Sequence, residues 1–215
     1  MLDICRGKHS GSRGHAGKGY VRAAVPALAA IAAAGLCLAS PGTASAAEST
    51  AQPPAGAALA WGDNTYGELG NGTTTNSPVP VAVDLPAGTR ATAIAAGYTQ
   101  SLAVTSTGSV LAWGYNAHGE LGDGTIGAPS ATPVPVDLPA GTRVTAIADA
   151  GQGLAMTSTG SVLTWGYNYH GDLGDGSTAN SSTPVPVDLP AGTSVVAIAA
   201  GGGGNSLAVA VHRSC

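Results

Sequence analysis

Short apolar runs separated by glycine-rich polar turns fill the chain from residue 58 onwards. The segment SLAVTSTGSVLAW at 101–113 has two such runs around Ser-Thr-Gly, which predicts a β-hairpin. The run PVPVDL at 133–138 predicts another strand, whose prolines favour an edge or outer position. After the turn sequence DLPAGT, the alternating run RVTAIA at 143–148 predicts a fourth strand. No helical periodicity interrupts this region.

This pattern occurs three times with nearly constant spacing. Trp61, Trp113 and Trp165 are 52 residues apart, and DLPAGT begins at residues 84, 137 and 188. A repeat of this length with four strands is typical of a β-propeller blade. Because phenylalanine is absent and aromatic residues are few, we expect each small sheet to gain its burial by stacking on the next. The sequence predicts an all-β protein of about three four-stranded repeats.

A glycine-rich motif follows each tryptophan: W-G-x-N-x-x-G-x-L-G-x-G, at 61–72, 113–124 and 165–176. It resembles the RCC1-like (regulator of chromosome condensation) repeat family, in a form we interpret as a secreted bacterial type. The resemblance implies a β-propeller, typically of about seven blades within the general range of ~4–8. A histidine of the family pattern is replaced here by Gln100, Gln152 and Asn205. Three repeats predict an incomplete ring, or a ring completed by oligomerisation.

The N-terminal region has the order of a secretory signal peptide. Residues 1–24 are basic, 25–39 are apolar, and Ala44-Ser45-Ala46 provides a small-residue cleavage site. The apolar run is shorter than the ~20 residues of a membrane-spanning helix, which favours a cleaved leader over a retained anchor. We therefore expect a leader at 1–46, a linker at 47–57, a repeat region at 58–215, and a secreted, extracellular protein. Abundant Ala, Gly and Pro with only two lysines indicate a GC-rich, bacterial genome.

Without the leader, the chain is strongly acidic. Residues 47–215 contain three arginines, no lysine and eleven carboxylates, a net charge of −8. This charge disfavours nucleic acid and anionic membranes as partners. Cys215 is the only cysteine outside the leader, and it could link two chains or have no role.

The sequence contains no recognisable catalytic constellation. It has no G-x-S-x-G elbow, no distinctive pair of carboxylates and no phosphate-binding G-K-S/T loop. Acids of the glycine-rich loops lack the full ligand set of a calcium site, and His118 and His170 lack neighbouring zinc ligands. We therefore expect no enzyme activity, no metal and no cofactor.

The Trp-Gly pairs favour a packing role over a row that stacks on carbohydrate, because the same pair recurs in every copy of the repeat. These structural repeat residues are Trp61, Gly62, Trp113, Gly114, Trp165 and Gly166.

Aromatic side chains on loops of a rigid scaffold are candidates for binding a protein partner. They are Tyr66, Tyr98, Tyr115, His118, Tyr167, Tyr169 and His170. The alternative is that these rings only cover the blade ends. We therefore interpret the chain as a secreted, non-catalytic binding or scaffold module whose partner is not identified by the sequence.

Other functions remain as alternatives. The family includes a secreted propeller that inhibits β-lactamases, which makes an inhibitor of a bacterial enzyme the second hypothesis. Guanine nucleotide exchange, the activity of the founding member, is disfavoured by the leader and the acidic charge. A hydrolase or lyase acting on cell-wall polymers has no visible site.

The two ends of the repeat region are complementary. The region begins with the tryptophan strand at 58–61 and ends with its partner strand at 206–211, whereas inside the chain these two strands form one hairpin at 101–113. Two chains paired head to tail in both directions would close a homodimeric ring of six blades, within the usual ~4–8. An open arc of blades is the alternative.

Overall fold

The computed structural model describes residues 56–202 and 204–212. This part of the chain contains twelve β-strands and no helix, so the predicted all-β fold is confirmed. It accordingly holds no helix long and apolar enough to cross a bilayer. The predicted leader at 1–46 and most of the linker at 47–57 lie outside the described residues.

Eight strands form two complete blades, each a four-stranded antiparallel meander. The first contains β3 (Ala91–Ala96), β4 (Gln100–Thr105), β5 (Val110–Gly114) and β6 (Ser130–Pro135). The second contains β7 (Val144–Asp149), β8 (Gln152–Thr157), β9 (Val162–Gly166) and β10 (Ser181–Pro186). The proline-containing strands β6 and β10 lie at the edges of their sheets, because proline cannot donate a ladder hydrogen bond.

The four remaining strands form two half blades. One pairs β1 (Leu59–Gly62) with β2 (Ser77–Ala82), and the other pairs β11 (Thr193–Gly201) with β12 (Asn205–His212). The register of β1 with β2 matches that of β5 with β6, so this half blade is the outer half of a blade. By the same comparison, β11 and β12 correspond to β3 and β4, the other half. The four strands of a third blade are thus divided between the two ends of the described region.

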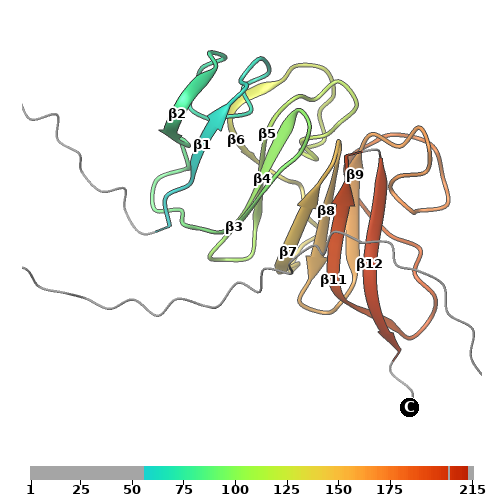
Figure 1. The fold of residues 1–215 in the computed structure, drawn as a ribbon. Coiled ribbons are helices and arrows are strands. Elements are labelled where there is room, and N and C mark those ends of the chain that lie inside the picture. Colours follow the sequence, from blue (N-terminus) through green and yellow to red (C-terminus); the bar gives the residue numbers. More distant parts are fainter. Residues whose placement is uncertain (1–55, 203, 213–215) are drawn as a thin grey trace, which may run out of the picture. The chain divides into compact units, whose positions relative to one another are not determined.

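Successive sheets stack face to face in chain order (Figure 1). Strand β7 packs against β3 and β4, and β11 packs against β7 and β8. One hydrophobic cluster between the complete blades includes Leu102, Leu121 and Trp165, and a second includes Ala58 and Trp113. Each blade therefore obtains its burial from its neighbours, as the composition predicts.

Candidate partner-binding surface

The glycine-rich loop of each repeat is held by a buried asparagine, the N of the W-G-x-N motif. Asn64, Asn116 and Asn168 are fully buried. The Oδ1 atom of each accepts a hydrogen bond from the backbone N–H five residues later, at 2.8, 3.1 and 3.0 Å respectively. The Nδ2 atom donates across the loop, for example from Asn116 to Thr125 Oγ1 at 3.0 Å. This bonding fixes the loop that carries the candidate aromatic residues.

Six of the seven candidate residues lie in one continuous series of ring contacts, which we call the aromatic row. It consists of Tyr66, Tyr115, His118, Tyr167, Tyr169 and His170, in that order, with successive ring centroids 4.8, 6.1, 5.2, 6.4 and 5.2 Å apart. Most of these contacts are edge-to-face or tilted, and the pair Tyr167–Tyr169 is stacked. The row crosses the loops of three successive repeats and therefore forms one surface.

The row combines exposed rings with rings that are fixed in place. Tyr66, Tyr169 and His170 are exposed, whereas Tyr115, His118 and Tyr167 are half-buried. The buried carboxylate of Glu120 holds His118 twice, accepting from its backbone N–H at 2.8 Å and contacting its Nδ1 at 2.9 Å. Glu68 likewise accepts from the backbone N–H of Tyr66 at 2.8 Å. These contacts pre-organise the row without blocking its outer face.

Alignment of the three repeats explains why most of these aromatic residues lie in one row. Tyr115 and Tyr167 share the third position of the motif, counted from the tryptophan, and Tyr66, His118 and His170 share the sixth. The ring contacts between repeats join the sixth position of one repeat to the third position of the next, Tyr66 to Tyr115 and His118 to Tyr167. The sequence therefore contained the signal for the row, in the spacing of 52 residues.

Tyr98, the seventh candidate, lies elsewhere. It is 86% exposed in the connection between β3 and β4. There it lines a cavity of about 410 Å³ together with Trp61, Ile94 and Trp113. The structure does not bring Tyr98 into the aromatic row.

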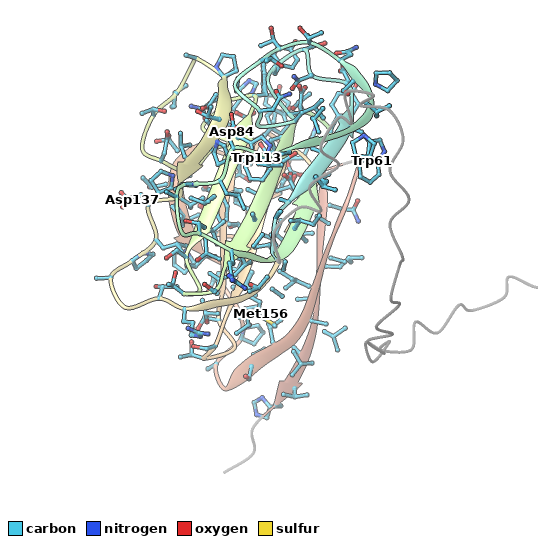
Figure 2. The ribbon with its side chains drawn as sticks, turned by 90° about the vertical axis from the view of Figure 1, so that its left-hand side faces the viewer. Trp61, Asp84, Trp113, Asp137 and Met156 are labelled. Carbon is cyan, nitrogen blue, oxygen red and sulfur yellow. The ribbon has the colours of Figure 1, made fainter. Side chains whose placement is uncertain are left out.

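The three tryptophans differ from one another in their surroundings. Trp113 and Trp165 are buried, and their Nε1 atoms donate to the backbone carbonyls of Glu68 and Glu120 at 2.7 and 2.9 Å. Trp61 is 64% exposed, so the packing expected at all three positions is present at two of them. The reason is that the described residues preceding β1 include no glycine-rich loop that could provide Trp61 with a carbonyl equivalent to those of Glu68 and Glu120. Figure 2 shows Trp113 among the strands and Trp61 at the side of β1.

Glycine is needed beside each tryptophan of the complete blades. Gly114 has a φ of +105°, and a Cβ on it would lie 2.5 Å from the carbonyl oxygen of Thr99. Gly62 and Gly166 have the same left-handed backbone, with φ of +109° and +98°. A larger residue would be strained at these positions.

A buried carboxylate that the sequence did not single out lies between the complete blades. Asp149, 9% exposed at the end of β7, accepts from Gln100 Nε2 at 2.8 Å and from the backbone N–H of Gly151 at 3.2 Å. The pKa of Asp149 is raised to about 7, chiefly by burial and to a smaller extent by the charge of Glu120, against the lowering effect of the two hydrogen bonds. The other repeats have Ala96 and Ala200 at this position, so no pattern marked it.

The glycine-rich loops carry acidic and histidine side chains, which raises the question of a metal site. No group of three or more His, Cys, Asp or Glu side chains suited to a metal ion occurs among the described residues.

Comparison with protein families decides the identity of the repeats. The family model described as "Regulator of chromosome condensation (RCC1) repeat" matches residues 55–104, 107–156 and 159–209, and a second RCC1 repeat model matches residues 91–120. The chain belongs to the RCC1 repeat family. Each matched segment contains one tryptophan and one glycine-rich loop, so the RCC1 repeats and the asparagine-held loops coincide.

Curated proteins with RCC1 repeats are similar to part of the chain. The ultraviolet-B receptor UVR8 of Arabidopsis thaliana is 30% identical over 137 residues, which is 63% of this chain and 31% of the receptor. The human E3 ubiquitin-protein ligase HERC2 is 36% identical over 119 residues, 55% of this chain and 2% of the ligase. The chain thus spans about a third or less of these relatives.

Solved RCC1-type structures share the fold. Human WBSCR16 has a TM-score of 0.58 at 25% identity, over 67% of this chain and 37% of that one. Prp20p of Saccharomyces cerevisiae, which binds Gsp1p and histones, has a TM-score of 0.62 at 18% identity, over 74% of this chain and 40% of that one. The β-propeller blade architecture predicted from the sequence is confirmed.

Proposed function

We propose that this RCC1-repeat chain is a secreted, non-catalytic protein-binding module and that the aromatic row is its contact surface. The observation that carries the proposal is the continuity of six aromatic rings across three loops. Tyrosine and histidine rings offer large contact areas with polar edges, and they lose little conformational entropy when they bind. Loops anchored by buried asparagines keep those rings in one arrangement before a partner arrives.

The partner's chemistry follows from charge. Residues 47–215 have a net charge of −8. A basic protein segment is attracted by this field, and its arginine side chains stack favourably on tyrosine faces. We therefore propose an arginine- or lysine-rich protein surface as the ligand of the aromatic row.

The secreted part of the proposal rests on the predicted leader. The order of basic, apolar and small-residue segments before residue 47 is that of a cleaved leader, and the alanine- and glycine-rich composition is that of a bacterial protein. A secreted enzyme inhibitor is the narrower version of the same proposal, in which the partner is an enzyme that loses activity when bound.

A titration with a synthetic arginine-rich peptide tests the proposal. Replacing Tyr66 and Tyr169 by alanine keeps every charge, and we expect it to weaken binding about tenfold or more. Val79→Ala, which removes an exposed apolar side chain from β2, should leave affinity unchanged. Equal affinity of the tyrosine variant and the unchanged chain would contradict a role for the row.

A second copy of the chain is the other partner that we propose. Each chain provides two complete blades and two complementary half blades. Two chains would form a ring of six blades, within the usual range of ~4–8.

A further inference from the structure

The same packing arrangement between neighbouring blades occurs twice among the described residues. The indole of Trp113 donates to the carbonyl of Glu68 and covers Gly70, and the indole of Trp165 does the same with Glu120 and Gly122. A Cβ on either glycine would lie 2.7 Å from the nearest indole atom. We call the pair of loop carbonyl and glycine a tryptophan site.

A third tryptophan site is formed by Asp172 and Gly174. Gly174 has a φ of +64°, against +63° and +65° at the two filled sites. The carbonyl of Asp172 accepts from Ser206 Oγ at 2.9 Å, as the carbonyl of Glu68 accepts from Ser101 Oγ at 2.9 Å. The nearest atom to a Cβ on Gly174 is a methyl of Val187, and no indole of the described residues covers this glycine.

A cavity of about 440 Å³ adjoins the third site. It is lined by Gly174, by Leu154 and by Leu207 of β12. Leu207 is 61% exposed, whereas its equivalents Leu102 and Leu154 are 0% and 2% exposed. The surface that buries this position in the complete blades is therefore not supplied here by the described residues.

At the other end of the described region, Trp61 is a tryptophan whose indole is not packed in any tryptophan site of the described residues. It is 64% exposed, against 3% for Trp113 and 0% for Trp165. It lines the cavity of about 410 Å³ beside β3 and β4, the surface on which an inner half blade would pack. An open tryptophan site and an unburied tryptophan thus occur once each.

The strand edges complement each other in register. In the complete blade, β4 pairs with β5 through Ser101↔Trp113, Leu102↔Ala112 and Ala103↔Leu111. Strands β8 and β9 pair in the same register. Among the described residues, no strand pairs with the second edge of β12 or of β1.

We propose that Trp61 of one copy occupies the Asp172–Gly174 site of a second copy, and that β1 of the first copy pairs with β12 of the second. This inference rests on the homodimer proposed above and specifies its contacts. The register of the complete blades places Ser206 opposite Trp61, Leu207 opposite Ala60 and Ala208 opposite Leu59. The same exchange in the opposite direction closes a two-fold ring.

A second copy suits this joint better than the chain's own end. The half blades are separated by two complete blades (Figure 1), and the described strands of one chain amount to three blades. Rings of blades need ~4–8 members. The joint continues an interface already built twice inside the chain, and it covers strand edges that otherwise invite aggregation.

Cysteine cross-linking tests the register. With Cys5, Cys37 and Cys215 replaced by serine, the chain carrying Ala60→Cys and Leu207→Cys should form a disulfide-linked dimer, because directly opposite Cα atoms are ~4.5–5.5 Å apart. The matched pair Ala60→Cys and Val209→Cys is two residues out of register, at ~7–8 Å or more, and should not cross-link. A cross-linked monomer, a ladder of longer species or equal linking by both pairs would overturn the proposal.

Trp61→Ala tests the tryptophan site. Because Trp61 is exposed in the monomer, the variant should keep its circular dichroism spectrum and lose at least about tenfold in dimer affinity. Tyr169→Ala removes another exposed aromatic side chain and should leave the dimer intact. Unchanged dimerisation of Trp61→Ala would refute the site, whereas loss of peptide binding by Tyr169→Ala bears only on the aromatic row.

Discussion

Single residues that lie between the blades contribute to the stability of the fold. Trp113 combines burial with a hydrogen bond of 2.7 Å to the Glu68 carbonyl, so its side chain joins two sheets. Gln100 and Asp149 add a polar contact of 2.8 Å at the next joint. An indole at such a joint is more sensitive to replacement than a ring on the surface.

Trp113→Ala should lower the free energy of unfolding by ~3–5 kcal/mol. Tyr169→Ala should change it by no more than ~0.5 kcal/mol, because Tyr169 is largely exposed. Urea unfolding followed by circular dichroism measures both values. Equal losses in the two variants would show that Trp113 does not hold the blades together.

Asp149 should make the chain less stable as the pH rises. Its folded pKa is raised from 3.8 to about 7, so the folded state favours the protonated form. Stability is therefore highest below the unfolded pKa and falls as the pH rises towards 7, by roughly 3 kcal/mol between pH 5 and pH 8. Asp149→Asn, which keeps an acceptor for Gln100, should abolish this decrease in urea unfolding.

Other carboxylates act in the opposite direction and at lower pH. Hydrogen bonds from the Thr65 side chain and from the Ser177 backbone N–H lower the pKa values of Asp63 and Asp175. The stability that these two carboxylates contribute is lost only as the pH falls below the ordinary value of 3.8.

A wild-type chain whose stability is constant from pH 5 to pH 8 would contradict the burial of an ionisable Asp149.

At the scale of elements, the local sequence predicted the strands, whereas the burial of individual side chains depends on the adjacent blade. The hairpin at 101–113 forms as predicted because its turn, Thr105 to Ser109, is encoded within it. The exposure of Trp61 and the burial of Asp149 depend on which blade lies alongside, and no local pattern carries that information. Alignment of equivalent loop positions would have revealed the aromatic row.

The loops depend on their buried asparagines. Asn116→Ala removes an acceptor for the N–H of Leu121 and a donor to Thr125, and leaves buried backbone groups without partners. We expect a loss of ~1–3 kcal/mol in the free energy of unfolding. Asn116→Asp keeps the acceptor but places a carboxylate in a fully buried site beside Thr125, so at neutral pH it should be at least as destabilised as Asn116→Ala. Equal stability of all three chains in urea would contradict this role.

At the scale of the whole molecule, the sequence predicts that the leader at residues 1–46 is removed. Export should be accompanied by cleavage after Ala46, because the small residues 44–46 follow the apolar run. Mass spectrometry of the secreted protein should find an N-terminus close to Ala47. A membrane-retained chain that keeps residues 1–46 would contradict the leader and the proposed extracellular role.

Each chain provides two complete blades and two complementary half blades, so we propose that the ring closes only when two chains assemble. Trp61, Leu207 and the third tryptophan site are satisfied together when a second chain is added in the register of the complete blades. The aromatic row lies on loops of the same blades, so dimerisation would duplicate the binding surface and raise avidity for a partner with several basic segments.

The native mass of the chain, measured by light scattering across a dilution series, distinguishes a ring of two chains from an open single chain. We expect a discrete dimer at micromolar concentrations that gives way to monomer on dilution, with dissociation shifted to higher concentration by Trp61→Ala. A folded monomer at every concentration, with Trp61 still exposed, would contradict this expectation.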